Sequence, residues 1–211
     1  MKTMDTLENL PYGAMSSPAA QRNIDSIRQV LAAHFPTHGR VLEIAAGTGE
    51  HAVALARAFP GLEWTAGDPS IEARTSIAAW TGFHGVPNLQ GPIDLDAAEA
   101  TTWPEGPFDA LLCINMIHIS PWSATEGLMA GAGAVLAHPG GLLALYGPFR
   151  EADIPLAPSN AAFDDSLKSR DARWGLRDLA AVVTEAKPHG LHLTRRIEMP
   201  ANNLMLLFRR A

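Results

Sequence analysis

The sequence has one cysteine, no long uninterrupted apolar run and no excess of basic residues, and each shortage excludes a class of protein. The single thiol, Cys113, excludes an internal disulfide and a thiolate metal cluster. The most apolar stretch, from Ala110 to Ile119, is interrupted by Asn115 and His118 and is too short to cross a bilayer. We therefore expect no membrane association.

The charge balance is acidic, with 16 Lys and Arg against 22 Asp and Glu and a net charge of −6. A chain that neutralises phosphates normally shows a basic excess or stripe, so a nucleic-acid partner is disfavoured and a small-molecule substrate fits better. The eight histidines show no metal-ligand spacing, so we predict no metal. Residues 1–15 lack the apolar core of a signal peptide, and we expect a cytoplasmic protein. The sequence does not indicate the oligomeric state.

A length of 211 residues with 47% hydrophobic and 18% charged residues predicts a single globular domain. Ser17 and Pro18 open a helix that runs to Pro36. Short apolar strands then alternate with helices, the strands at 41–45, 62–66, 89–93, 108–114 and 142–146 and the helices at 50–59, 71–80 and 122–136. This alternation predicts an α/β fold, with a parallel sheet and helices on both of its faces.

The last third of the chain departs from this alternation. Residues 147–174 are rich in Pro, Ser, Asn, Asp and Arg and predict a long loop, which in a compact domain is usually functional. A helix at 176–186 follows, and strands at 191–198 and 204–209 predict an antiparallel hairpin added at the edge of the sheet. The predicted sheet therefore has seven strands and is mostly parallel.

The strongest motif is Glu43-Ile44-Ala45-Ala46-Gly47-Thr48-Gly49, between the first strand and the helix that follows it. Glycines allow positive φ and close approach of a ligand, and the amides at the helix start point towards that ligand. Asp68 ends the second strand, where it can accept hydrogen bonds from both hydroxyls of a ribose. Asp94 ends the third strand, beside the expected position of an adenine amino group. Because all of these lie at carboxyl ends of parallel strands, they predict a nucleotide-type ligand.

Two cofactors fit this pattern. Gly47-x-Gly49-x-x-Ala52 also satisfies the dinucleotide fingerprint, so an NAD-dependent oxidoreductase is an alternative. Glu43 argues against NAD, because its carboxylate would face a pyrophosphate but suits a cationic amino group. The antiparallel C-terminal hairpin is also foreign to a dinucleotide fold.

The segment from Glu43 to Gly49, Asp68, Asp94 and the terminal hairpin together resemble the class I S-adenosylmethionine-dependent methyltransferases, over residues 39–211. The family pattern often reads E-x-G-x-G-x-G, and here its first glycine is Ala45. The resemblance implies a Rossmann-like fold, S-adenosylmethionine as cofactor and S-adenosylhomocysteine as product. The implied cofactor-binding residues are Glu43, Ala45, Gly47, Thr48, Gly49, His51, Asp68, Pro69, Asp94, Leu95 and Asn115.

A narrower resemblance covers nearly the whole chain. It is carried by the segments Ser17–Asn23, Cys113–Trp122, Tyr146–Phe149 and Pro158–Asp164, which are similar to the methyltransferase-like protein 26 family. That family's methyl acceptor is not established. The pattern of elements divides a single domain of residues 1–211 into an N-terminal arm and helix (1–38), a cofactor-binding core (39–146), a substrate lid loop (147–174) and a C-terminal helix and hairpin (175–211).

Three residues are candidates for the chemistry. Asn115 and His118 follow the fourth strand, near the expected methyl group. There Asn115 would orient the acceptor or the methionyl group, and His118 would act as a base or as a hydrogen-bonding ligand. The alternatives are that Asn115 caps the turn, which we favour less than a functional role, and that His118 packs beneath Trp122, which fits the sequence equally well. Tyr146 ends the fifth strand, as the next wall of the same cleft or as a core residue with a tethered hydroxyl.

Further residues are candidates for holding the methyl acceptor. They lie on the first helix, on the fifth strand and in the long loop, and are Arg22, Asn23, Tyr146, Asn160, Arg173 and Trp174. An arginine on a first helix is also commonly a solvated surface residue, which is the alternative for Arg22. A further alternative for the whole chain is a non-catalytic domain that binds S-adenosylmethionine or a partner protein, because Ala45 and the lack of a strong base motif leave turnover open.

Overall fold

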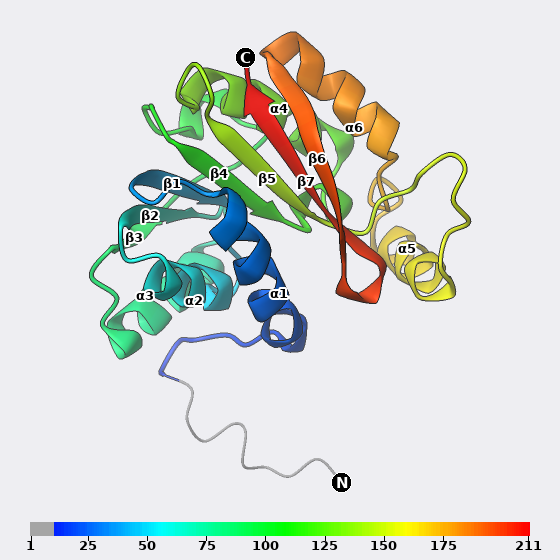
Figure 1. Ribbon diagram of the computed structural model, residues 1–211. Helices are drawn as coiled ribbons and strands as arrows, with labels where there is room; N and C mark the ends of the chain where they lie inside the picture. Colours follow the sequence, from blue (N-terminus) through cyan, green and yellow to red (C-terminus); the bar gives the residue numbers. More distant parts are fainter. Residues whose placement is uncertain (1–10) are drawn as a thin grey trace, which may run out of the picture.

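Seven strands form one sheet in the order β3-β2-β1-β4-β5-β7-β6 (Figure 1). The computed structural model describes residues 11–211, so most of the expected N-terminal arm lies outside the described residues. The strands are β1 (Gly39–Ile44), β2 (Leu62–Gly67), β3 (Leu89–Ile93), β4 (Ala110–Ile114), β5 (Leu142–Gly147), β6 (Leu191–Met199) and β7 (Asn203–Arg210). The first five pair in parallel, and β7 is antiparallel to both β5 and β6. The predicted mostly parallel sheet with an antiparallel C-terminal hairpin is confirmed.

Helices cover both faces of this sheet, as the alternation of strands and helices predicted. They are α1 (Pro18–His34), α2 (Glu50–Ala58), α3 (Ile71–His84), α4 (Trp122–Val135), α5 (Pro158–Arg170) and α6 (Leu179–Ala186). Successive residues of a strand point to opposite faces, so Val41 belongs to the apolar cluster shared with α1, α2 and α3 whereas Leu42 belongs to the one shared with α4 and α6. Figure 1 shows these two groups of helices on the two sides of the sheet. The sheet therefore separates two apolar layers, and its carboxyl edge is left for the loops.

The prediction of a loop over residues 147–174 is wrong, because this segment contains the thirteen-residue helix α5. The buried residues of α5 are Asn160, Asp164 and Leu167, which lie at helical spacing on one face. Two of these three side chains are polar, so the helix lacks the apolar stripe from which helices are predicted. Helix α6 also begins later than predicted, at Leu179, where the Ala181 amide donates to the capping side chain of Asp178 at 3.0 Å.

Asp164 holds α5 against the rest of the chain. Its side chain is buried and accepts hydrogen bonds from the Leu176 amide at 2.8 Å, from Lys168 Nζ at 2.6 Å and from Arg150. Burial alone would raise the pKa of this carboxyl, but these hydrogen bonds and the Arg150 charge hold its pKa below the ordinary value. One carboxylate therefore joins the segment after β5, the helix α5 and the segment before α6.

Among residues 11–211, no helix combines the length and the apolar character that crossing a bilayer requires.

Replacing Asp164 with Asn should lower the free energy of unfolding by about 2 kcal/mol, because the buried ion pairs and the Leu176 hydrogen bond lose their charged acceptor. The matched control is Asp165→Asn, at the exposed neighbouring position. Chemical denaturation of both variants measures the difference. Equal stabilities would contradict the anchoring role of Asp164.

Candidate functional site

The turn after β1 contains three residues with positive φ, Ala45 at 54°, Gly47 at 57° and Gly49 at 85°. The two glycines serve different purposes. A Cβ on Gly49 would lie 2.8 Å from the Ile77 Cα, so this glycine allows α3 to pack closely. A Cβ on Gly47 would meet no atom within 4 Å, so this glycine leaves open space beside the turn. That open space is what a ligand approaching the backbone would need.

Ala45 occupies the position where the methyltransferase pattern has its first glycine. Its left-handed conformation costs about 1 kcal/mol for a residue with a Cβ. Ala45 also borders the cavity described below. Strain of this kind persists only where the surrounding structure enforces it, and it is common at ligand sites.

Asp68 joins this turn to the end of β2. Its Oδ2 accepts from the Gly47 amide at 2.9 Å, and its Oδ1 accepts from the Ser70 amide at 2.9 Å. The side chain is 7% exposed. Because each carboxylate oxygen has two lone pairs, both oxygens retain capacity to accept from a ligand.

A cavity of about 450 Å³ opens at this point, between the ends of β1, β2 and β3, the turn after β4 and the segment before α6. The sequence predicted five of its lining residues, and the structure brings them together: Ala45, Asp68, Pro69, Leu95 and Trp174. Asp96, Met116, Ser120 and Ser123 also line it and were not predicted. The cavity volume lies within the range of small-molecule binding sites.

Asp94 does not line this cavity, although its position at the end of β3 predicted a contact with adenine. Its side chain is 67% exposed and pairs with Arg74 at 2.9 Å. Asp96, two residues further along, lines the cavity instead, and its Oδ1 accepts from the Ala98 amide at 2.9 Å. The sequence could have indicated Asp96, because it is a second acidic residue in the turn after β3.

Glu43 lies beneath the turn and is 2% exposed. Its Oε2 accepts from the Trp64 indole N–H at 2.9 Å. Burial raises the pKa of this carboxyl to about 8, although the Trp64 hydrogen bond opposes the rise. At neutral pH the group is therefore mostly protonated. It then lacks the negative charge that, in the sequence, argued against the pyrophosphate of NAD.

His51, Asn23 and Tyr146 meet although they come from α2, α1 and β5. The Nε2 of His51 and the Asn23 Oδ1 are 2.7 Å apart, and because the Asn oxygen only accepts, the imidazole donates. Asn23 also lies close enough to Tyr146 to lower the pKa of its hydroxyl, against the larger effect of burial. Burial lowers the pKa of His51 to about 4 and raises the pKa of Tyr146, so both side chains are neutral near pH 7.

The start of α1 is also fixed to the glycine turn. Glu50 accepts from the Ser17 amide at 2.6 Å and from the Thr48 hydroxyl at 3.0 Å. Together with the Asn23 contact, this places α1 over one side of the carboxyl edge. Arg22, on the same helix, is exposed and forms no part of these contacts.

Asn115 follows β4 in the left-handed conformation, with φ of 62°, and its amide donates to the Tyr146 carbonyl at 2.8 Å. Its side chain does not cap the short helical turn that follows it. A Cβ on the neighbouring Gly147 would lie 3.1 Å from the Asn115 Oδ1, so the carboxamide lies beside the end of β5. This geometry agrees with a carboxamide held at the strand ends.

His118 is fully buried. Its Nδ1 accepts from the Arg177 amide at 3.3 Å, its ring centroid is 4.9 Å from that of Phe149, and a Cβ on Gly147 would lie 2.5 Å from its Nε2. Burial and then the Arg177 charge lower the pKa of His118 to about 3. The structure thus places His118 beneath Gly147 and against Phe149, and not in the wall of the cavity. At this position its ring accepts the hydrogen bond from Arg177, in the segment before α6.

The same segment carries Trp174, which forms a cavity wall. The Gly175 amide donates to the His118 carbonyl at 2.9 Å, and Arg177 Nε donates to the Ile117 carbonyl at 2.7 Å. Arg173, in contrast, points to solvent, with a 70% exposed side chain paired with Asp171 at 2.7 Å. Asn160 borders a second cavity, so the predicted acceptor-binding residues do not form one group.

Comparison with known proteins supports the fold. The family model described as "Protein of unknown function (DUF938)" matches residues 14–210. A tRNA (guanine-N(7)-)-methyltransferase from Rhodopseudomonas palustris is 36% identical over 81 residues, which cover 38% of this chain and 31% of that protein. The matched family has no stated activity, so the narrower resemblance to the methyltransferase-like protein 26 family stays a prediction.

Solved methyltransferase structures share the fold at low sequence identity. A putative O-methyltransferase from Nostoc punctiforme has a TM-score of 0.78 at 18% identity, over 91% of this chain and 57% of its own length. An O-methyltransferase family protein from Burkholderia thailandensis has a TM-score of 0.77 at 16% identity, over 92% of this chain and 56% of its own length. The magnesium protoporphyrin IX methyltransferase from Synechocystis was solved with bound S-adenosylhomocysteine. It has a TM-score of 0.68 at 16% identity, over 90% of this chain and 83% of its own length. The chain thus spans little more than half of the first two relatives, and the Rossmann-like methyltransferase fold is confirmed.

The two glycines of the turn should respond differently to alanine. Gly47→Ala should lower the free energy of unfolding by about 1 kcal/mol, the cost of a Cβ at positive φ. Gly49→Ala adds a contact with the Ile77 backbone and should cost about 3 kcal/mol or more. Chemical denaturation measures both values. Equal losses would contradict the distinction between open space and close packing.

The contribution of Glu43 to stability should fall as the pH rises from about 4.5 towards 8, because the unfolded chain ionises Glu43 first while the folded chain retains the proton. The lowered pKa values of His51 and His118 act in the opposite sense below about pH 6.5, so the Glu43 contribution is read from the difference between wild type and variant. Glu43→Gln keeps an acceptor for Trp64 and should flatten this dependence. Glu63→Gln, at an exposed position of β2, is the matched control. Thermal unfolding between about pH 5 and about pH 8 measures the slopes. An unchanged slope for Glu43→Gln would mean that Glu43 is ionised in the folded protein.

Proposed function

This chain belongs to the DUF938 family, and we propose that it is an S-adenosylmethionine-dependent methyltransferase that acts on a small molecule. The observation that carries the proposal is Asp68, which closes the Gly47 turn beside a cavity at the carboxyl ends of β1 to β3. Open α/β sheets bind their ligands at this edge. The shared fold with solved methyltransferases supports the same conclusion.

The residues at this edge fit the cofactor. The space beside Gly47 accepts a ligand against the backbone, and the Asp68 oxygens have lone pairs for two ribose hydroxyls. Leu95 and Asp96 line the part of the cavity next to β3, where they would contact the adenine. Bound S-adenosylmethionine supplies a methyl group on a sulfonium that is a good leaving group. The chain itself has to hold the acceptor in line and exclude water.

Asn115, Asn23 and Tyr146 are the residues that we assign to positioning. Asn115 is held at the end of β4 and would orient the acceptor through its carboxamide. The ordinary pKa of a tyrosine, about 10, already keeps Tyr146 protonated at neutral pH, and burial raises its pKa further. Its hydroxyl would therefore donate a hydrogen bond rather than remove a proton. His118 has no role as a base in this proposal, because it is buried with a pKa of about 3. The acceptor atom is then one that is already nucleophilic when it binds.

The matched pair Asp68→Asn and Asp94→Asn tests the cofactor site. Calorimetric titration of the wild-type protein should show binding of S-adenosylmethionine and S-adenosylhomocysteine and none of NAD. Asp68→Asn should weaken the adenosyl ligands by about tenfold or more, the loss expected from a charged hydrogen-bond acceptor. Asp94→Asn should leave them nearly unchanged, because Asp94 points to solvent.

Gly47→Ala provides an independent check, because its Cβ enters the space that the ligand would occupy. Loss of binding in a variant that remains folded supports the site. Binding of NAD, or no binding by the wild-type protein, would refute the proposed function. Binding of both adenosyl ligands without methyl transfer to any compound of a cell extract would favour the non-catalytic alternative.

A further inference from the structure

Two buried side-chain atoms have no hydrogen-bond partner among residues 11–211, His118 Nε2 and Thr125 Oγ1. The hydroxyl hydrogen of a threonine can rotate towards a neighbouring acceptor, whereas an imidazole N–H is fixed in the plane of its ring. Buried polar atoms are normally paired, so an unpaired imidazole nitrogen beside the strand ends requires an explanation. His118 is therefore the more informative of the two residues.

The proton on the His118 ring is located by the other ring nitrogen. Nδ1 accepts from the Arg177 backbone amide at 3.3 Å, and a backbone amide can only donate. The ring is fully buried, and burial lowers its pKa to about 3, so it is neutral and carries one proton. That proton must then be on Nε2. The unpaired atom is therefore a hydrogen-bond donor.

The carboxamide oxygen of Asn115 lies beside this edge of the ring. A Cβ on Gly147 would lie 2.5 Å from His118 Nε2 and 3.1 Å from Asn115 Oδ1. Gly147 is not among the glycines with positive φ, so its missing side chain matters for space rather than for backbone conformation. The imidazole donor and the carboxamide oxygen thus border the same small space at the end of β5.

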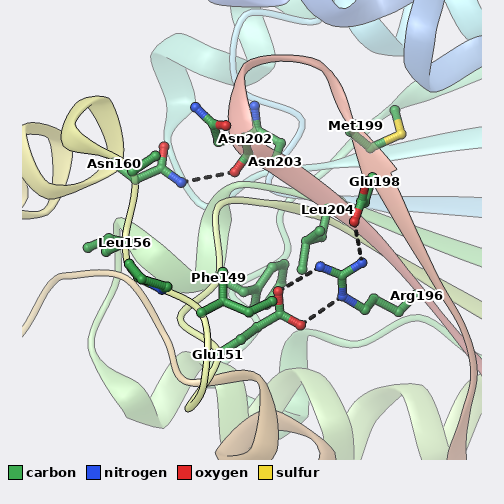
Figure 2. A pocket seen from close by; sticks show the side chains of 13 residues that line it. Phe149, Glu151, Leu156, Asn160, Arg196, Glu198, Met199, Asn202, Asn203 and Leu204 are labelled. Atoms are coloured by element: carbon green, nitrogen blue, oxygen red, sulfur yellow. Dashed lines mark hydrogen bonds and ion pairs between the residues drawn. The ribbon is translucent and has the colours of Figure 1, made fainter.

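The backbone around both side chains is fixed. The Asn115 amide donates to the Tyr146 carbonyl at 2.8 Å, and the His118 amide donates to the Asn115 carbonyl at 3.0 Å. The His118 ring packs edge to face against Phe149, which lies in the wall of the second cavity (Figure 2). The Asn115 side chain is only half-buried and does not cap the turn that follows it. Its carboxamide is therefore the part of this group that can turn.

The two ends of the Asn115 carboxamide are not equivalent beside a donor. With its amino group turned to His118 Nε2, the carboxamide would bring two donors together, so the oxygen is the end that faces the ring. The amino group then points away from His118. Asn115 thereby presents N–H donors at the end of β4, next to Met116 in the cavity wall.

We propose that His118 is a positioning residue for Asn115. When a ligand is bound, the His118 Nε2–H donates to Asn115 Oδ1, and the Asn115 amino group donates to a carbonyl or carboxylate oxygen of that ligand. A turn of the carboxamide closes the gap that separates the two side chains. Resting on the proposed function, the oxygen belongs either to the amino-acid carboxylate of the cofactor or to the methyl acceptor. An ammonium group, which only donates, is excluded from this position.

NMR of the full chain with nitrogen-15 histidine tests the premise without any ligand. His118 should show a protonated Nε2 and an unprotonated Nδ1, and it should stay neutral at about pH 5 because its pKa is near 3. The signals that disappear in His118→Asn identify this residue. A proton on Nδ1 would overturn the proposal.

Two variants test the direction of the hydrogen bond from Asn115 to the ligand. Asn115→Asp keeps an oxygen for His118 and removes the donor, and aspartate also tolerates the left-handed conformation. Asn115→Gly removes the side chain without strain. Asn115→Asp should be about tenfold worse than wild type and worse than Asn115→Gly, because a carboxylate repels an acceptor oxygen. Asn202→Asp is the matched control, since this asparagine also has positive φ, of 57°, at the turn of the β6–β7 hairpin (Figure 2).

Two measurements on these variants locate the oxygen. Calorimetric titration compares S-adenosylhomocysteine with 5′-methylthioadenosine, which lacks the amino-acid part. A loss confined to S-adenosylhomocysteine assigns the oxygen to the cofactor. Unchanged binding of both, with a lower initial rate of methyl transfer from S-adenosylmethionine to the small-molecule fraction of a cell extract, assigns it to the acceptor.

His118 should act only through Asn115. His118→Asn keeps an acceptor for the Arg177 amide but lacks the donor at Nε2, and it should lower the affected quantity about threefold. His118→Gln restores an amide donor near that position and should retain most of it. In the Asn115→Gly background, His118→Asn should have no further effect.

Three results would overturn this inference. The first is an Asn115→Asp variant that equals or exceeds Asn115→Gly in both measurements. The second is an equal loss in Asn202→Asp, and the third is a His118→Asn loss that persists in the Asn115→Gly background. A wild-type protein that binds neither adenosyl ligand, although His118 carries its proton on Nε2, refutes the proposed function instead.

Discussion

The hydrogen bonds from the Gly47 and Ser70 amides to Asp68 are the interaction on which the rest of the site depends. They fix the turn after β1 to the end of β2 and set the start of α3. A carboxylate that accepts two amides keeps lone pairs for further donors, so one residue can hold the turn and contact a ligand. Under the proposed function, folding and binding are coupled at this residue, because the carboxylate that holds the turn belongs to a residue that lines the cavity.

Local signals in the sequence predicted the sheet well, because strands such as β4 and β5 are short apolar runs that need only their own residues to be recognised. Helix α5 escaped prediction for a physical reason. Its buried positions include Asn160 and Asp164, which are satisfied by partners distant in sequence, such as Asn202 and Leu176. A polar residue buried by a tertiary hydrogen bond is indistinguishable, in sequence, from one that faces solvent.

The residues of the candidate site also fall into two groups, those placed by the ends of the strands and those placed by contacts with distant parts of the chain. Asp68 and Pro69 were predicted because the ends of parallel strands converge at one edge whatever the details of packing. Asp94 lies outside the cavity and Asp96 lines it, since beyond a strand end the direction of a side chain depends on the path of the loop. The surroundings of His118 were also beyond reach, because they come from Arg177, 59 residues away.

Segments outside the core of residues 39–146 cover both sides of the carboxyl edge. Helix α1 reaches it through Asn23, whereas Trp174 is held there by contacts that include those of His118. The strand ends between them carry the turn and Asp68, which the proposed function assigns to the cofactor. Under the proposed function, the choice of acceptor must then come from the covering segments. Their polar contacts explain why they are fixed in place although they lack an apolar core of their own.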